Sequence, residues 1–310
     1  MIYVTGATGH IGNNLVKELD KKNYDFKILA RKTTPAIKEF NQQIIIGNIF
    51  SKSFLTKHIK SGDTLIHLAA YINLKNTDIK LTEKVNYIST KTIADFCKDN
   101  KVYLIFSSSV DAIYSKDYLI SEPNKLNPDK LSNIYQITKA KATNYIIDLS
   151  NKNNLESFII YPSAVVGIND YKPSPIGKEK KKCFRKKICF YFQGGYNFID
   201  VKDVIPIIIK AIDKKITGSI ILSGYYVSLY RMYKLIFHSL NKKPLMIKVP
   251  LYLIKFISKI IPKYKVMIEA LISNHNYNNN KMQNGFNILP TPISKTIIET
   301  VKWFKTNEEY

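Results

Sequence analysis

The first twelve residues, MIYVTGATGHIG, constrain the fold of this chain more than any other stretch. A short apolar strand at residues 2–4 leads into a turn with three glycines, and a helical apolar pattern follows. Gly6 permits the tight turn, Gly9 lets the backbone approach a phosphate, and Gly12 lets the helix pack closely on the strand. The start of the helix offers free N–H groups and the positive end of its dipole. The stretch therefore predicts a dinucleotide-binding turn, with an ordinary glycine-rich turn as the alternative.

Strands and helices alternate through the first half of the sequence. We expect strands at residues 2–4, 26–29, 43–46, 64–67, 102–107 and 157–161, and helices at residues 13–21, 83–99 and 134–151. Because these strands are nearly continuous apolar runs, they indicate a parallel sheet that is covered on both faces. The fold class is therefore α/β, a doubly wound Rossmann sheet, with residues 1–165 as the cofactor-binding domain.

The second half has a different texture. Residues 166–310 are expected to form a smaller, mostly helical substrate lobe, with segments of about residues 198–222 returning to the first domain. Residues 251–272 are apolar but interrupted by lysines, which excludes a membrane-spanning helix. We expect helices packed within the second lobe here, and peripheral contact with an anionic membrane is the alternative.

Composition limits the partners and the compartment. The formal net charge is +23, but 44 of the 47 basic residues are lysine, so specific nucleic-acid binding, which favours arginine, is not expected. The dense basic run at residues 178–187 is expected to be a solvated helix face, with attraction of an anionic substrate through Arg185 as the alternative. Three cysteines and no secretory signal suggest a cytoplasmic protein. No histidine has a partner at metal-ligand spacing, so we expect no metal site.

Residues at three further places in the sequence indicate redox chemistry. Arg31 and Lys32 follow the second strand where a binder of unphosphorylated cofactor would carry an acid, which favours NADP, with NADPH preferred over NADH. A solvated basic pair is the alternative. Tyr135 and Lys139 lie one helical turn apart, and the ammonium is expected to lower the phenol pKa for acid–base work. Ser109 ends the serine triplet after an apolar strand, at the sheet edge where ligands bind.

Together these pieces resemble the extended short-chain dehydrogenases/reductases of the NAD-dependent epimerase/dehydratase superfamily. The matching motifs are TGATGHIG (5–12), HLAA (67–70), VN (85–86), FSSS (106–109), YQITK (135–139), YPSAVVG (161–167) and FIDVKDV (198–204). They cover most of the chain in the right order. The segment GGYNFIDVKDV and the ending GF…VKWF are most similar to the dihydroflavonol-4-reductase-like branch.

The resemblance implies roles for individual residues. Tyr135 is then the proton donor or acceptor, Lys139 holds the nicotinamide ribose and tunes Tyr135, and Ser109 polarises the reacting carbonyl. The remaining implied cofactor contacts are Gly6, Thr8, Gly9, His10, Ile11, Gly12, Arg31, Lys32, Asn48, Ile49, Leu68, Ala69, Ala70, Asn86, Pro162, Ser163 and Val165. Asn48 departs from the family, which usually has Asp there, so the adenine contact at this position stays open.

Three functions remain open at this point. The first is an NADPH-dependent reductase that transfers hydride to a small ketone or aldehyde with Tyr135 as proton donor, or that oxidises the corresponding alcohol in the reverse direction. The second is a nucleotide-sugar epimerase or dehydratase that retains NAD, although the Asp-Glu pair of dehydratases is absent after Ser109. The third is a non-catalytic protein that senses NAD(P). The family often pairs through helices, so a homodimer is also open.

Overall fold

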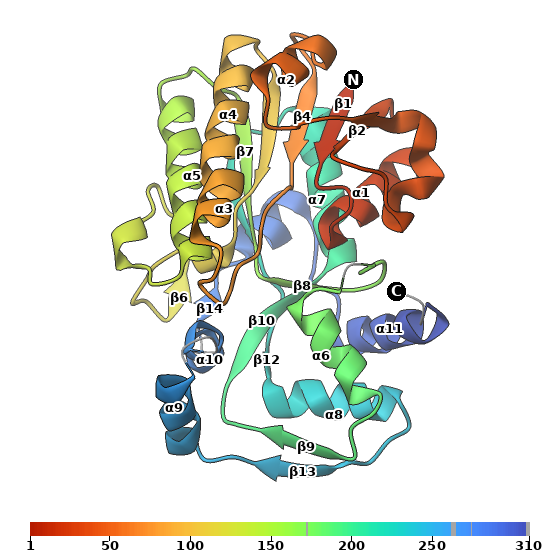
Figure 1. Cartoon of the computed structure of the whole chain (residues 1–310), viewed down its shortest axis with the longest axis vertical. Coiled ribbons are helices and arrows are strands. Elements are labelled where there is room, and N and C mark those ends of the chain that lie inside the picture. Colours follow the sequence, from red (N-terminus) through yellow and green to blue (C-terminus); the bar gives the residue numbers. More distant parts are fainter. Residues whose placement is uncertain (172, 262–264, 274, 308–310) are drawn as a thin grey trace.

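A seven-stranded parallel sheet forms the centre of the computed structural model, which describes residues 1–171, 173–261, 265–273 and 275–307 (Figure 1). Its strands lie in the order β11-β7-β5-β4-β1-β2-β3, the doubly wound order of a Rossmann fold. Their bounds are β1 Ile2–Thr5, β2 Phe26–Ala30, β3 Ile44–Ile46, β4 Thr64–His67, β5 Tyr103–Ser107, β7 Ser157–Pro162 and β11 Gly218–Leu222. The predicted fold class is confirmed.

Helices cover both faces of this sheet (Figure 1). Apolar side chains of α1 (His10–Lys21) and α7 (Val201–Lys214) pack on one face, in a core that includes Leu15, Val204 and Ile208. On the other face α2 (Lys52–His58), α4 (Ser89–Asp99) and α5 (Ile134–Asn151) form a second core. Burial on both faces explains why the strands are continuous apolar runs in the sequence.

The predicted elements are present, with shifted boundaries. α1 begins at His10, three residues earlier than expected, because the glycine turn itself enters the helix. β3 begins at Ile44 rather than at residue 43. The helix expected at residues 83–99 is divided into α3 (Ile79–Glu83), a π-helical turn (Lys84–Ile88) and α4. Such turns are rare and often mark functional positions.

The second lobe has its own small sheets and core. β8 (Ala164–Val166), β10 (Gly195–Asp200) and β12 (Tyr225–Ser228) form one sheet, and β9 (Ile188–Tyr191) pairs with β13 (Leu245–Lys248). Helices α6 (Pro175–Cys183), α8 (Leu229–Ser239), α10 (Lys265–Ile272) and α11 (Ile293–Thr306) complete the lobe. Its core gathers around α8 and α11, with Phe237 and Val301 buried.

Two connections tie the lobes together. α7 and β11 follow β10 in the chain but pack in the Rossmann core, where β11 pairs with β7 in parallel. A two-residue ladder joins β6 (Leu119–Ile120) to β14 (Asn276–Tyr277), so the segment between α10 and α11 returns to the first lobe. The second lobe is therefore linked to the first at two places.

The packing expected for residues 251–272 is wrong for its first half. α9 (Leu251–Ile260) is helical as predicted, but it contains no buried residue, and Tyr252, Phe256 and Ile260 are largely exposed. α10 does pack, through buried Ile268. The prediction also touched residues 262–264, which lie outside the described residues. Among the described helices, none has the length and hydropathy to cross a membrane.

The basic run at residues 178–187 lies on α6 and the turn after it. Glu179 accepts from Lys186 at 2.6 Å and from Lys182 at 3.2 Å, and Arg185 is exposed. The two ion pairs and the exposure agree with the solvated helix face that the sequence favoured.

Candidate active site

The glycine turn between β1 and α1 is built by close backbone contacts. Gly6 has a φ of +78°, and a Cβ there would lie 2.6 Å from the backbone nitrogen of Ala69. A Cβ on Gly12 would lie 2.3 Å from the carbonyl oxygen of Gly6. Gly9 is exposed and forms the N-cap, while Thr8 is half-buried in the turn. Side chains are therefore excluded at the two positions where the turn folds back on its neighbours.

The first turn of α1 is available to an anion. No side chain caps this helix and its first turn contains no acid. His10 and Ile11, both half-buried, begin it, and His10 Nε2 lies 2.9 Å from the carbonyl oxygen of Ile168. Uncapped N–H groups at a helix start bind phosphate well. These features fit the pyrophosphate of a dinucleotide.

Arg31 and Lys32 lie directly after β2, next to the glycine turn in the sheet order. Both are exposed, and neither forms an ion pair with another residue that the structure describes. Asn48 is exposed, but its Oδ1 accepts from the backbone of Phe50 at 3.2 Å. Ile49 is buried in the core. The two cations are thus accessible to a ligand, whereas Asn48 already serves its own loop.

The loop after β4 packs against the glycine turn. The backbone N–H of Leu68 donates to the Thr5 carbonyl, and that of Ala69 donates to Thr5 Oγ1. Ala70 is exposed at the end of this loop. Buried Asn86 holds the next residue, Tyr71, through its backbone N–H and carbonyl at 2.8 and 3.0 Å. Asn86 comes from the π-helical turn, so this irregular turn fixes the loop.

Ser109 and Tyr135 lie together where β5 ends. α5 begins beside this edge because Asn133 caps it, accepting from the backbone N–H of Tyr135 at 2.8 Å. Both Ser109 and Tyr135 are more than nine-tenths buried, and the Ser109 hydroxyl lies near enough to Tyr135 to affect the pKa of its phenol. Lys139, one turn further along α5, donates to the Ser107 carbonyl at 2.5 Å. The structure thus gathers the three predicted catalytic side chains around the end of one strand.

The protonation states of this cluster differ from the expectation. Burial and the charge of Asp111 raise the pKa of Tyr135 well above its usual value, and the hydrogen bond with Ser109 opposes this only in part. Burial lowers the pKa of Lys139 to about 7. The prediction that Lys139 lowers the phenol pKa is therefore wrong for this structure: its ammonium is directed to the Ser107 carbonyl and the Phe106 ring.

Two residues of the cluster were missed in the sequence. Asp111 is half-buried near Tyr135 and accepts a short hydrogen bond from the hydroxyl of Tyr196 on β10. Burial raises the pKa of this carboxyl, and the Tyr196 bond opposes the rise. Asp111 lies two residues after Ser109, and Tyr196 belongs to the GGYNFIDVKDV segment. Only their contact across 85 residues reveals the pair.

The segment after β7 contains three of the predicted cofactor contacts. Pro162 ends that strand, and Val165 is half-buried in β8. The backbone N–H of Ser163 donates to the Leu222 carbonyl, while its buried hydroxyl has no partner within the described part of the chain. A buried hydroxyl without a partner is costly unless a ligand satisfies it. Together with the uncapped α1, it supports a polar cofactor lying across the strand ends.

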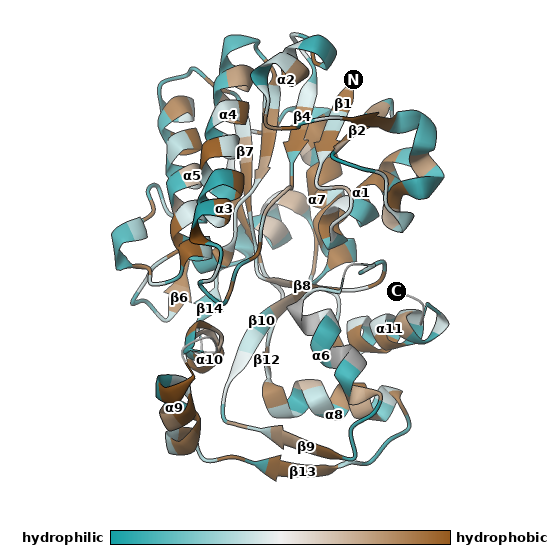
Figure 2. Ribbon diagram, viewed as in Figure 1, coloured by the Kyte–Doolittle hydropathy of each residue, from teal (hydrophilic) through white to brown (hydrophobic). Residues whose placement is uncertain are grey.

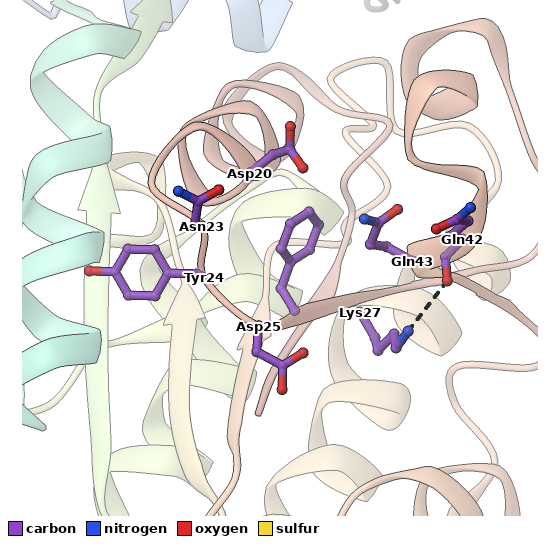
Figure 3. A pocket seen from close by; sticks show the side chains of 8 residues that line it. Asp20, Asn23, Tyr24, Asp25, Lys27, Gln42 and Gln43 are labelled. Carbon is purple, nitrogen blue, oxygen red and sulfur yellow. Dashed lines mark hydrogen bonds between the residues drawn. The ribbon is translucent and has the colours of Figure 1, made fainter.

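A separate pocket of about 330 Å³ lies elsewhere (Figure 3). It is lined by Asp20, Asn23, Tyr24, Asp25, Phe26, Lys27, Gln42 and Gln43, at the amino end of β2. That is the sheet edge opposite the glycine turn, so the pocket does not belong to the site. No group of three potential metal ligands occurs among the residues that the structure describes.

The doubly wound sheet and the glycine turn define a dinucleotide-binding fold. Residues 2–222 match the profile of the NAD dependent epimerase/dehydratase family, and the chain belongs to this family. It is 25% identical over 219 residues to sterol demethylase protein B of Methylococcus capsulatus, which covers 69% of this chain and 66% of that protein. It is 28% identical over 207 residues to a putative dihydroflavonol 4-reductase of Synechocystis sp., covering 65% of this chain and 60% of that protein.

The matched regions thus span less than two thirds of these relatives' own length. The whole chain superimposes on the crystal structure of gox2253, with a TM-score of 0.86 at 23% identity, covering 99% of this chain and 98% of that one. At this identity the likeness shows the fold alone. The family resemblance inferred from the sequence motifs is confirmed.

Proposed function

We propose that this protein is an NADPH-dependent reductase of a small-molecule ketone or aldehyde, with Ser109, Tyr135 and Lys139 as its catalytic residues. The observation that carries the proposal is the burial of Ser109 and Tyr135 together at the end of β5, with Lys139 one turn further along α5. At neutral pH the buried Tyr135 is a neutral phenol with a proton to give, and the Ser109 hydroxyl beside it can hold a carbonyl oxygen in place.

The proposed chemistry divides between the cofactor and the protein. NADPH, when bound, supplies a hydride to the carbonyl carbon. Tyr135 gives its proton to the carbonyl oxygen, while the Ser109 hydroxyl holds that oxygen in place. A proton from solvent then restores the phenol. The product is an alcohol.

The remaining contacts are proposed for the cofactor. The turn residues Gly6, Thr8, Gly9, His10, Ile11 and Gly12 would hold the pyrophosphate. Leu68, Ala69 and Ala70 would line its middle, Pro162, Ser163 and Val165 the nicotinamide pocket, and Asn48 and Ile49 the adenine side. Lys139 would bind the ribose, and Asn86 supports the site by fixing the loop at Tyr71.

The preference for NADP rests on Arg31 and Lys32. Both are exposed beside the glycine turn, where the 2′-phosphate of NADP meets the protein in this fold. Replacing Arg31 by Ala is expected to weaken NADPH binding about tenfold or more, since a charge-assisted hydrogen bond contributes ~1.5–3 kcal/mol. NADH binding should not change. Fluorescence titration of each variant with NADPH and with NADH measures both affinities. An equal loss for both cofactors would contradict the preference.

The second candidate is a nucleotide-sugar epimerase that retains NAD. It is favoured by the family name, which includes epimerases, whereas the exposed Arg31 and Lys32 favour a phosphorylated cofactor over retained NAD. A non-catalytic NAD(P) sensor is disfavoured by the intact catalytic cluster.

The deciding experiment screens NADPH oxidation against a panel of ketones, aldehydes and lactones, with Tyr135→Phe as control. We expect at least one substrate to be reduced, and Tyr135→Phe to lower kcat by about 10²–10⁴-fold, the usual contribution of general acid catalysis. NAD released from the denatured protein, together with epimerisation of a nucleotide sugar without net NADPH use, would establish the second candidate instead.

We also propose how the chain is divided into domains, where the protein is located and whether it forms dimers. Residues 1–165 would be the cofactor-binding domain and residues 166–310 the substrate lobe, with segments of about 198–222 belonging to the former; the position of β11 in the main sheet supports this. A cytoplasmic location is supported by the three cysteines, all of which are free and buried. A homodimer, if formed, would sediment in analytical ultracentrifugation with twice the mass of one chain.

A further inference from the structure

The second lobe carries an apolar helix, α9, one side of which is left uncovered by the described part of the chain. α9 exposes Tyr252, Leu253, Phe256, Ile257 and Ile260, with Phe256 61% exposed. At 100° per residue these five side chains fall within an arc of about 140°. Lys255 and Lys259 border one edge of this arc, and the half-buried residues lie on the opposite side. A helix that turns its apolar side outward resembles an interfacial helix, with lysines at the rim.

The strand pair next to α9 has the same polarity. In β9 and β13 the residues alternate: Cys189 is buried and Met246 is half-buried against the lobe core, whereas Phe190 is 60% exposed. The parallel register places Ile188 beside Leu245 and Phe190 beside Ile247, so the outward side is entirely apolar. These four residues and the five of α9 are called the apolar end face below.

The apolar end face lies at the end of the molecule away from the seven-stranded sheet. α9 follows β13 after two residues, and both lie along the lower edge of the second lobe in Figure 1. Figure 2 shows α9 as a strongly hydrophobic helix, and β9 and β13 share this character. Exposed apolar side chains gathered at one end of a folded protein mark an interaction site.

The positive charge around the apolar end face favours an anionic partner. Residues 214–268 contain eleven Lys or Arg and no Asp or Glu. Lys248, Lys255 and Lys259 are exposed on or beside the apolar end face. A second copy of this chain would present the same positive charge, which disfavours self-association through this face. An anionic bilayer offers both opposite charge at its headgroups and an apolar layer beneath them.

We propose that the apolar end face docks this protein on an anionic lipid membrane as a peripheral, non-spanning attachment. The aromatic and aliphatic side chains of α9 and the β9–β13 pair enter the headgroup boundary, and the flanking lysines contact lipid phosphates. This inference does not depend on the proposed reaction, because no residue of the apolar end face belongs to the catalytic cluster.

The test is sedimentation of the full-length protein with lipid vesicles. One set of vesicles is pure phosphatidylcholine and the other contains phosphatidylserine as well. We expect the protein to sediment with the anionic vesicles, to remain in solution with the neutral ones, and to dissociate as salt is raised. No sedimentation with either set overturns the proposal, as does equal sedimentation with both.

Paired variants separate this face from the overall charge. Lys255→Gln/Lys259→Gln is expected to weaken vesicle binding about thirtyfold, since each lysine near the surface contributes a factor of ~5. Lys57→Gln/Lys60→Gln removes the same charge from exposed positions of the first lobe and should have little effect. Equal losses in the two double variants would mean that total charge alone drives binding, and the proposal would fail.

The apolar contribution is tested with Phe256→Ser, compared with Leu289→Ser at an exposed position outside the face. Only Phe256→Ser is expected to reduce vesicle binding, by about tenfold or more. Because Phe256 makes no buried contact, circular dichroism and NADPH binding should be unchanged. A concentration-dependent dimer that Phe256→Ser abolishes, with no vesicle binding, would assign the face to a second copy of the chain.

Discussion

Gly6 and Gly12 meet through their backbones, and no other residue type fits at Gly12 without moving the turn. We expect Gly12→Ala to destabilise the protein and abolish cofactor binding, because its Cβ would lie 2.3 Å from the Gly6 carbonyl oxygen. Gly285→Ala is the matched control, since a Cβ there meets nothing within 4 Å. Thermal unfolding with and without NADPH measures both effects. A Gly12→Ala protein that still gains stability from NADPH would contradict the prediction.

Lys139 makes stability depend on pH. Burial lowers its pKa to about 7 in the folded protein, whereas the unfolded chain keeps the usual value of 10.5. Between these values the unfolded state binds more protons, so the free energy of unfolding rises with pH by up to about 1.4 kcal/mol per unit from this group. Below pH 7 both states are protonated and the effect ends.

Urea unfolding at pH 7, 8 and 9 tests this with Lys139→Met. The variant should lack the wild-type rise in stability across this window and should be catalytically inactive. Lys57→Met, at an exposed position, should keep the wild-type rise. Parallel curves for wild type and Lys139→Met would show that the ammonium is not held at a lowered pKa.

Individual site residues were predictable only where a local pattern marks them. Ser109, Tyr135 and Lys139 lie in short motifs at a strand end and on one helix face, and the structure gathers them. Asp111 carries no such mark, because its burial arises from contact with Tyr196 on a distant strand. The pKa of Tyr135 was misjudged for the same reason: it depends on burial and on Asp111, not on sequence spacing.

At the scale of elements, α5 positions the Tyr135 side chain through its N-terminal cap. Asn133 accepts from the backbone N–H of Tyr135 and donates to Asn76. Asn133→Ala is expected to cost ~1 kcal/mol of stability, the usual loss of an N-cap, and to lower kcat because Tyr135 lies in the first turn. Chemical denaturation and turnover measure the two effects. Asn133→Asp, which can still cap, should retain most of both; equal damage in both variants would contradict the capping role.

The sequence predicts which segments form helices and strands better than it predicts what those segments pack against. The strands of the central sheet are apolar runs because both of their faces are buried, and this pattern is local. The surroundings of α9 are not local: apolar composition predicts a buried helix, yet α9 lies at the margin of the lobe with no buried residue. The π-helical turn before α4 was also missed, because it satisfies Asn86 and its partners rather than a periodic pattern.

For the whole molecule, a net charge of +23 opposes folding through self-repulsion. We therefore expect Tm to rise by about 4 °C between 20 and 300 mM NaCl, equivalent to ~2 kcal/mol for a chain of this size. Sucrose at equal osmolality is the control, because it stabilises by exclusion without screening charge. A Tm that is unchanged or lower in NaCl would show that the lysines are spaced too widely to repel one another.

The late position of β11 in the chain has a consequence during synthesis. β7 is buried along all six of its residues, and β11 is its neighbour on the outer side of the sheet. A ribosome must therefore release residue 222 before that neighbour can be added. Until then β7 is an apolar edge strand whose backbone groups are free to pair with other chains. Binding by a chaperone would therefore protect the nascent chain most at this stage of translation.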